Sequence, residues 1–94
     1  MITVWKYQVG ASDTFYVDMP KGAKVLDVQL QRTLTGRIPQ IWALVDTEAP
    51  TTRRWFRHTG TNHSIKESLN LDYVGTYQVE DLRLVFHLFE ILNG

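Results

Sequence analysis

Apolar and polar side chains alternate along this chain with a dominant period of two residues. Between residues 23 and 34, Leu26, Val28 and Leu30 alternate with Asp27, Gln29 and Gln31. Successive side chains of a β-strand point to opposite faces, so this pattern is typical of a strand with one buried and one solvated face. An amphipathic helix would repeat near 3.6 residues instead. The pattern therefore predicts a mainly β protein.

Seven segments show this pattern or are rich in the β-branched and aromatic residues that favour strands. They cover residues 2–9, 14–19, 23–34, 40–46, 52–59, 72–79 and 82–92. Turn-forming residues separate them, including Pro20-Lys21-Gly22, Thr35-Gly36-Arg37 and Glu80-Asp81. Such an arrangement predicts a small antiparallel β-sandwich or a partly open barrel of about seven short strands.

Two further features refine this expectation. The segment 40–46 is apolar on both faces, which predicts a strand that is central in its sheet or covered on both sides. The segment 82–92 is also apolar on both faces and would be prone to aggregation unless something covers it. Pairing with a second subunit is one way to cover 82–92, so we expect a homo-oligomer. Ser64 and Glu67 are three residues apart, the spacing of a capping box, and predict at most one short helix near 64–69.

Length and composition exclude several classes of protein. The 94 residues suit a single domain spanning 1–94. The absence of cysteine excludes disulfides, thiolate metal sites and cysteine nucleophiles, and favours a reducing cytoplasm. Ten Lys and Arg balance ten Asp and Glu, which argues against long nucleic acid as a partner. The N-terminus lacks the pattern of a signal peptide, and 82–92 is too short to span a bilayer, so we expect no membrane partner.

The sequence carries no motif for catalysis. It lacks a glycine-rich phosphate loop and a glycine-flanked serine. His58, His63 and His87 do not have the spacing of a metal site, so we expect neither a metal nor a cofactor. We therefore expect a binding protein and not an enzyme.

The strongest candidate site lies in the segment 52–59. A strand there would place Arg53, Trp55 and Arg57 on one face, with Phe56 on the core side. Arginine binds phosphate in a bidentate manner and tryptophan stacks on a base, so the trio suits a phosphorylated aromatic ligand. The same residues are favoured anchors in protein interfaces. The simplest interpretation is an ordinary exposed strand on which the arginine stems cover Trp55.

Other candidates lie in or near the following loop. Thr61 and His63 belong to a polar loop and could form hydrogen bonds to a ligand, whereas His87 is expected to be a buried imidazole with its hydrogen bonds satisfied. A set of aromatic residues is expected to lie mainly in the core, with one or two members lining a pocket. These are Trp5, Tyr7, Trp42, Tyr73 and Tyr77.

The whole chain resembles a large family of small phage and prophage proteins. The resemblance rests on Val4-Trp5-Lys6-Tyr7, on 20–29, Trp42-Ala43-Leu44-Val45-Asp46, Phe56-Arg57, Gly60-Thr61, His63 with Ile65, Tyr73-Val74-Gly75-Thr76, and 84–90. Two departures are Asn62, where the family commonly has glycine, and an unusually long hairpin around 33–37.

This resemblance implies a phage-type anti-defence protein in the host cell cytoplasm, similar to the anti-CBASS sponges that sequester cyclic nucleotides. Together with the residue pattern, it predicts that Arg53 and Arg57 bind phosphate, Trp55 stacks on a base, and Thr61 and His63 donate hydrogen bonds. The alternative is a protein-interaction module, such as an inhibitor of a host defence protein or an accessory virion protein.

Overall fold

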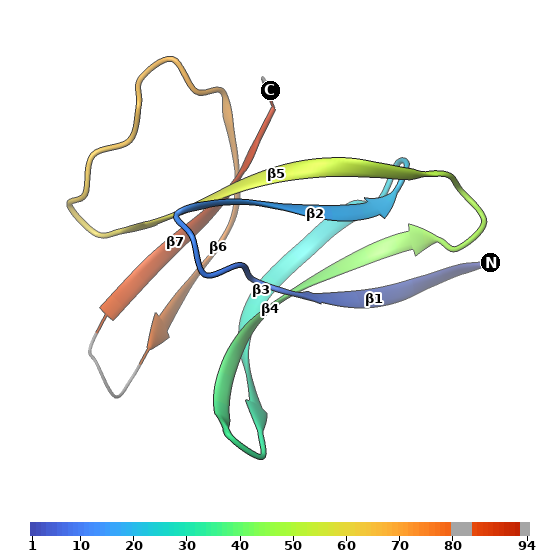
Figure 1. The fold of residues 1–94 in the computed structure, drawn as a ribbon, viewed down its shortest axis with the longest axis horizontal. Coiled ribbons are helices and arrows are strands. Elements are labelled where there is room, and N and C mark those ends of the chain that lie inside the picture. The colour runs from blue at the N-terminus through green and yellow to red at the C-terminus, as the bar shows by residue number, and fades with distance from the viewer. Residues whose placement is uncertain (80–83, 93–94) are drawn as a thin grey trace.

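The computed structural model describes residues 1–79 and 84–92, which form seven antiparallel strands in two sheets and contain no helix (Figure 1). The strands are β1 (Ile2–Gln8), β2 (Thr14–Pro20), β3 (Lys24–Thr33), β4 (Gly36–Asp46), β5 (Thr51–Gly60), β6 (Leu71–Val79) and β7 (Leu84–Ile91). One sheet has the order β1-β4-β3 and the other the order β2-β5-β7-β6. The expectation of a small antiparallel β-sandwich is confirmed, and the sheets do not close into a barrel.

One core fills the space between the inner faces of the two sheets. Its largest fully buried side chains are Val28, Ile41 and Val45 from the three-stranded sheet, and Met19, Phe56 and Leu88 from the four-stranded sheet. The two inner faces come together because burying these apolar side chains removes them from water.

No helix forms at 64–69, so the helix expected from Ser64 and Glu67 is wrong. A single turn closes there, where the Leu69 amide donates to the Lys66 carbonyl at 3.1 Å. The chain re-enters the sheet at Leu71, which leaves too few residues to repay the cost of nucleating a helix. The turn expected at Glu80-Asp81 and the expected start of the last strand at residue 82 lie outside the described residues.

The two strands that are apolar on both faces lie inside their sheets. β4 pairs with β1 and β3, and β7 pairs with β5 and β6. Both edges of the β7 backbone are therefore hydrogen-bonded within the chain. Its apolar character gives no reason for pairing with a second subunit at this strand, and the homo-oligomer stays a prediction.

The sheets approach most closely where β3 crosses β6, and each strand has an irregularity there. The register shifts between Val25 and Asp27 in β3 and between Tyr73 and Gly75 in β6. A Cβ atom on Gly75 would lie 2.8 Å from Cγ1 of the buried Val28. The crossing therefore requires a residue without a side chain at position 75.

Candidate functional site

The outer face of the four-stranded sheet carries three of the predicted site residues. On β5, Arg53, Trp55 and Arg57 alternate with Arg54 and Phe56, and Phe56 is fully buried in the core. The three odd-numbered side chains consequently point away from the core, as strand alternation predicted. Trp55 remains 40% exposed.

Pairing between strands extends this trio into a wider surface, which we call the aromatic platform. It consists of Tyr16 on β2, Trp55 and Arg57 on β5, Phe89 on β7 and Tyr73 on β6. Tyr16 lies opposite Trp55, Arg57 opposite Phe89, and Tyr73 opposite Phe89. The Tyr16 and Trp55 rings meet edge to face at 5.3 Å, and the Tyr73 and Phe89 rings at 5.7 Å.

The two arginines of the trio differ in their partners. Arg53 donates from Nε to Asp18 Oδ1 at 3.2 Å, and its guanidinium lies 3.8 Å from the centre of the Tyr16 ring. Arg57 donates only from Nη1 to the Thr14 hydroxyl, at 3.4 Å, and pairs with no carboxylate among the described residues. Its positive charge is therefore not neutralised within the described part of the chain.

Arg57 also contains an unused hydrogen-bond donor. Its Nε is buried and has no acceptor, and the buried hydroxyl of Thr59, the next outward position on β5, also lacks a partner. Buried polar groups are nearly always hydrogen-bonded. The protein therefore leaves two polar groups unpaired at neighbouring outward positions of β5.

A chain of hydrogen bonds connects Thr61 to the platform. The Thr61 hydroxyl lies 2.8 Å from His87 Nε2, His87 Nδ1 lies 3.0 Å from the Thr76 hydroxyl, and the Thr76 hydroxyl lies 2.7 Å from the Tyr73 hydroxyl. A neutral imidazole donates from one nitrogen and accepts at the other, and each hydroxyl can do both. The chain thus ends at the exposed hydroxyl of Tyr73.

His87 occupies a different environment from the one expected. Its ring is satisfied by hydrogen bonds as predicted, but it is half-buried on the outer face and not buried in the core. The physical reason is the register, which pairs His87 with the outward-facing Thr59 and Thr76.

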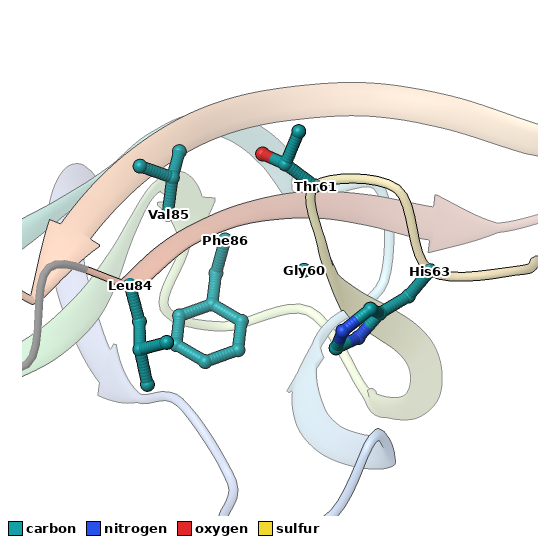
Figure 2. Close-up of a pocket in the computed structure, with 6 residues that line it drawn as sticks. All are labelled: Gly60, Thr61, His63, Leu84, Val85 and Phe86. Atoms are coloured by element: carbon teal, nitrogen blue, oxygen red, sulfur yellow. The ribbon is translucent and has the colours of Figure 1, made fainter.

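His63 does not join the platform. Figure 2 shows its ring on the same side of β7 as Phe86 and Leu84, whereas Thr61 and Val85 point to the opposite side. These residues line an open pocket of about 410 Å³. Gly60 admits the imidazole, because a Cβ atom there would lie 2.9 Å from His63 Nδ1. A second pocket, of about 200 Å³, is lined by His63 and Thr61 together with Thr59, His87 and Phe89, so the structure brings Thr61 and His63 together beside the platform.

The even-numbered side chains of β5 carry polar groups on the inner face. Arg54 donates from Nη2 to Glu90 Oε1 at 2.8 Å and from Nη1 to the Ala23 carbonyl at 2.7 Å. The hydrogen bond to Glu90 raises the pKa of Arg54. Because these atoms face the core, they are structural and lie outside the candidate site.

A second inner-face contact joins His58 to Tyr77. The His58 Nε2 donates to the Ser12 carbonyl at 2.6 Å, so in the neutral ring Nδ1 accepts from the Tyr77 hydroxyl at 3.0 Å. Burial raises the pKa of Tyr77 to about 12, which keeps its hydroxyl protonated as a donor.

Sequence reasoning missed the contributions of Tyr16, Thr59, Thr76 and Phe89. Alternation could have assigned each of them to a face of its own strand. It could not show that the faces of β2, β6 and β7 lie beside that of β5, because pairing joins residues far apart in the sequence.

Within residues 1–79 and 84–92, no group of three or more histidine and acidic side chains could hold a metal ion. The same part of the chain contains no helix that is long and apolar enough to cross a membrane.

Comparison with known proteins gives one match. A family model described as a domain of unknown function (DUF7352) matches residues 1–93. No curated protein and no solved structure matches the chain.

Proposed function

The chain belongs to the DUF7352 family, a domain of unknown function, and we propose that it is a non-catalytic domain that binds a small nucleotide on its aromatic platform. The observation that carries this proposal is the state of Arg57. Its guanidinium has no carboxylate partner among the described residues, and its buried Nε has no acceptor. An anionic oxygen is the group that such an arginine binds most strongly.

The neighbours of Arg57 suit the aromatic part of a nucleotide. Trp55 is two residues away on the same face of β5, and Phe89 lies directly opposite on β7. Stacking of one base on an aromatic side chain contributes about 1–3 kcal/mol and tolerates any base. Charge and stacking surface are therefore adjacent, as a phosphate and its base are in a nucleotide.

The remaining predicted residues have unequal parts in this proposal. The Tyr73–Thr76–His87–Thr61 chain offers hydroxyl groups for a sugar or base edge beside the platform. Arg53 should contribute less to phosphate binding than Arg57, because it would first have to break its ion pair with Asp18. His63 lines a pocket together with Thr61, His87 and Phe89, so we expect it to contribute only at the border of the proposed surface.

The size of the ligand follows from charge. The formal net charge is zero, and a long nucleic acid requires many basic contacts. A mononucleotide or a cyclic di- or trinucleotide needs only a few. The resemblance of the sequence to small phage proteins, and not the match to the DUF7352 family, suggests that such a signal is sequestered by a phage-type anti-defence protein.

Thermal-shift measurements test the proposal. Cyclic di- and trinucleotides and linear mononucleotides would be titrated to millimolar concentration against the full chain. A ligand at one hundred times its dissociation constant should stabilise the protein by about 2.7 kcal/mol. Arg57→Met should weaken binding by about 10- to 100-fold, since hydrogen bonds to charged groups contribute about 1.5–3 kcal/mol.

The control is Arg32→Met, which removes an exposed arginine from the other sheet and should leave binding unchanged. Trp55→Leu should weaken binding of every nucleotide and spare inorganic phosphate. If no nucleotide stabilises the protein at millimolar concentration, or if both arginine variants have the same effect, the proposal is wrong.

A second candidate function has its own supporting observation. Tyr16, Trp55 and Tyr73 are 48%, 40% and 60% exposed on one open sheet face. Tyrosine, tryptophan and arginine are the side chains most enriched at the energetic centres of protein interfaces. A partner protein that binds wild type but not Arg57→Met, with nucleotide binding absent from both, would favour this alternative.

A further inference from the structure

Within residues 1–79 and 84–92, no strand pairs with the backbone of β1 along its outer side. Of the four strands at sheet edges, β3 and β6 contain register shifts and pack against each other, and β2 contains Asp18 and ends at Pro20. Bulges, prolines and charged residues are the usual means of preventing an edge strand from pairing. β1 has seven residues in continuous register with β4 and no proline, and its one charged residue, Lys6, donates to Gln31 Oε1 on β3 at 2.8 Å, away from the free edge.

Two hydrogen bonds reveal which backbone groups of β1 face this free edge. The Thr47 amide donates to the Met1 carbonyl at 2.9 Å, and the Val9 amide donates to the Pro39 carbonyl at 3.0 Å. Residues of an antiparallel strand direct their N–H and C=O groups alternately to one side and the other. The odd-numbered residues therefore face β4, and Ile2, Val4, Lys6 and Gln8 direct their backbone groups outward.

The side chains at the middle of β1 are apolar and exposed on both faces. Val4, on the outer face of its sheet, is 47% exposed. Trp5 is opposite the buried Ala43 and thus lies on the inner face, yet it is 42% exposed. The sandwich core therefore leaves a large part of this indole uncovered.

We propose that two copies of the chain pair through β1, antiparallel, about a two-fold axis at Trp5. This register places Val4 opposite Lys6 of the partner subunit and Ile2 opposite Gln8 of the partner subunit. All four outward-facing residues of each strand then pair, giving four pairs that exchange two hydrogen bonds each. The result is a continuous six-stranded sheet with β3 of each copy at its ends.

The two Trp5 side chains meet at the centre of this interface. They occupy a non-hydrogen-bonded pair, in which opposite side chains lie closest, with Cβ atoms about 4.5–5.5 Å apart. Aromatic pairs of this kind are among the more favourable cross-strand contacts. The exposed indole that the core leaves uncovered would thus be buried against its own copy.

Neighbouring registers are less favourable. An axis at Val4 leaves the backbone groups of Gln8 without a partner, and an axis at Lys6 places two ammonium groups directly opposite each other, which is destabilising. The free edge of β1 therefore suits a second copy of the chain. In the register centred on Trp5, all outward backbone groups form hydrogen bonds, and the lysine at position 6 does not face the same lysine of the partner subunit. The inference does not depend on the proposed nucleotide binding.

The register can be tested by changing the charges at positions 4 and 6 and measuring the dissociation constant of the dimer by sedimentation equilibrium. Wild type should be a dimer. Val4→Lys places a lysine opposite Lys6 at two symmetric positions and should raise the dissociation constant at least tenfold. Adding Lys6→Glu to Val4→Lys creates two opposite-charge pairs and should restore the dimer. Both positions are exposed within one chain, and Lys6→Glu removes only an exposed hydrogen bond to Gln31, so the fold should be retained, as circular dichroism would verify.

The control Lys24→Glu changes an exposed charge on β3 and should leave the dimer unchanged. The proposal is wrong if the wild-type protein is monomeric at several hundred micromolar. A monomer is also the result expected if β1 pairs with a strand of another protein instead of with its own copy. A dimer that Val4→Lys does not weaken would also overturn the proposal.

Disulfide trapping provides an independent measurement, because the chain has no cysteine of its own. In the proposed pair the two Cα atoms at position 5 are about 4.5 Å apart, within the range of a disulfide. Under mild oxidation, Trp5→Cys should form a covalent dimer. Thr3→Cys should not, because its position faces Tyr7 of the partner subunit. Equal cross-linking of the two variants would contradict the register.

Discussion

Arg54 and Arg57 are three residues apart on β5 and have opposite environments. Arg54 points inward, where Glu90 and the Ala23 carbonyl accept its hydrogen bonds. Arg57 points outward, where Thr14 is its one hydrogen-bond partner among the described residues. The difference arises because three is an odd number of strand residues, so the two side chains lie on opposite faces. The inner arginine stabilises the fold, and the outer one is available to a ligand.

Removing the partner of the inner arginine should destabilise the protein strongly. Glu90→Gln leaves Arg54, whose side chain is 20% exposed, without its carboxylate. Breaking a buried ion pair in this way costs about 3–5 kcal/mol, and the lower end is expected here because Arg54 keeps the Ala23 carbonyl. Urea unfolding measures the change in free energy.

Asp18→Asn is the matched control for that prediction. It breaks the Arg53–Asp18 pair on the outer face, where both side chains are about half exposed. Exposed ion pairs contribute about 0–1 kcal/mol. Equal losses from the inner and outer variants would show that the Arg54–Glu90 pair is not a buried structural contact.

At the scale of elements, two glycines bring segments into close approach with different consequences. Gly75 allows β6 to cross β3 beside the fully buried Val28, which is held on all sides by the core. Gly60, at the end of β5, lies against the exposed ring of His63, which is free to move. The clearance for an added Cβ atom is nearly the same, 2.8 Å and 2.9 Å, but the neighbours differ in mobility.

Gly75→Ala should therefore destabilise the protein by about 1–3 kcal/mol, the usual effect of overpacking a core. Gly60→Ala should change stability much less and should instead displace His63, visible as shifts of its ring resonances in NMR spectra. Adding Val28→Ala to Gly75→Ala should give a smaller loss than the two single effects combined. Strict additivity of these variants would indicate that the two residues do not touch.

At the scale of the whole molecule, burial of tyrosine hydroxyls makes stability depend on alkaline pH. The pKa of Tyr77 is raised from 10.0 to about 12 by burial, and burial raises the pKa of Tyr7 as well. Above pH 10 the unfolded chain releases these protons while the folded chain retains them. The stabilising contribution is thus complete below pH 10 and is lost as the pH rises towards 12.

Tyr77→Phe should reduce this dependence. At pH 8 we expect the variant to be about 1 kcal/mol less stable than wild type, because the hydrogen bond to His58 is lost. Urea unfolding at intervals from pH 8 to 11 should show this difference shrinking, since one pKa unit corresponds to about 1.4 kcal/mol. Tyr16→Phe, on the outer face, is the control, and a difference that stays constant with pH would contradict the prediction.

The sequence by itself determined the strand content and, in strands without a register shift, the face of each side chain. Alternation placed Phe56 in the core and Trp55 outside it, because successive side chains of a regular strand point to opposite faces. In β6 the register shift places Tyr73 outside and Tyr77 in the core, which alternation alone could not show. The same reasoning identified β4 and β7 as strands apolar on both faces. For the candidate site, it identified the residues on β5 and Thr61 in the following loop.

Only the tertiary structure decided which strands are neighbours. Tyr16 and Trp55 are 39 positions apart in the sequence, and their contact depends on the register between β2 and β5. That register is set by the packing of the whole core, to which every strand contributes. For the same reason the sequence could not show that β7 lies inside its sheet, that His87 lies on the outer face, or that β1 is left with a free edge.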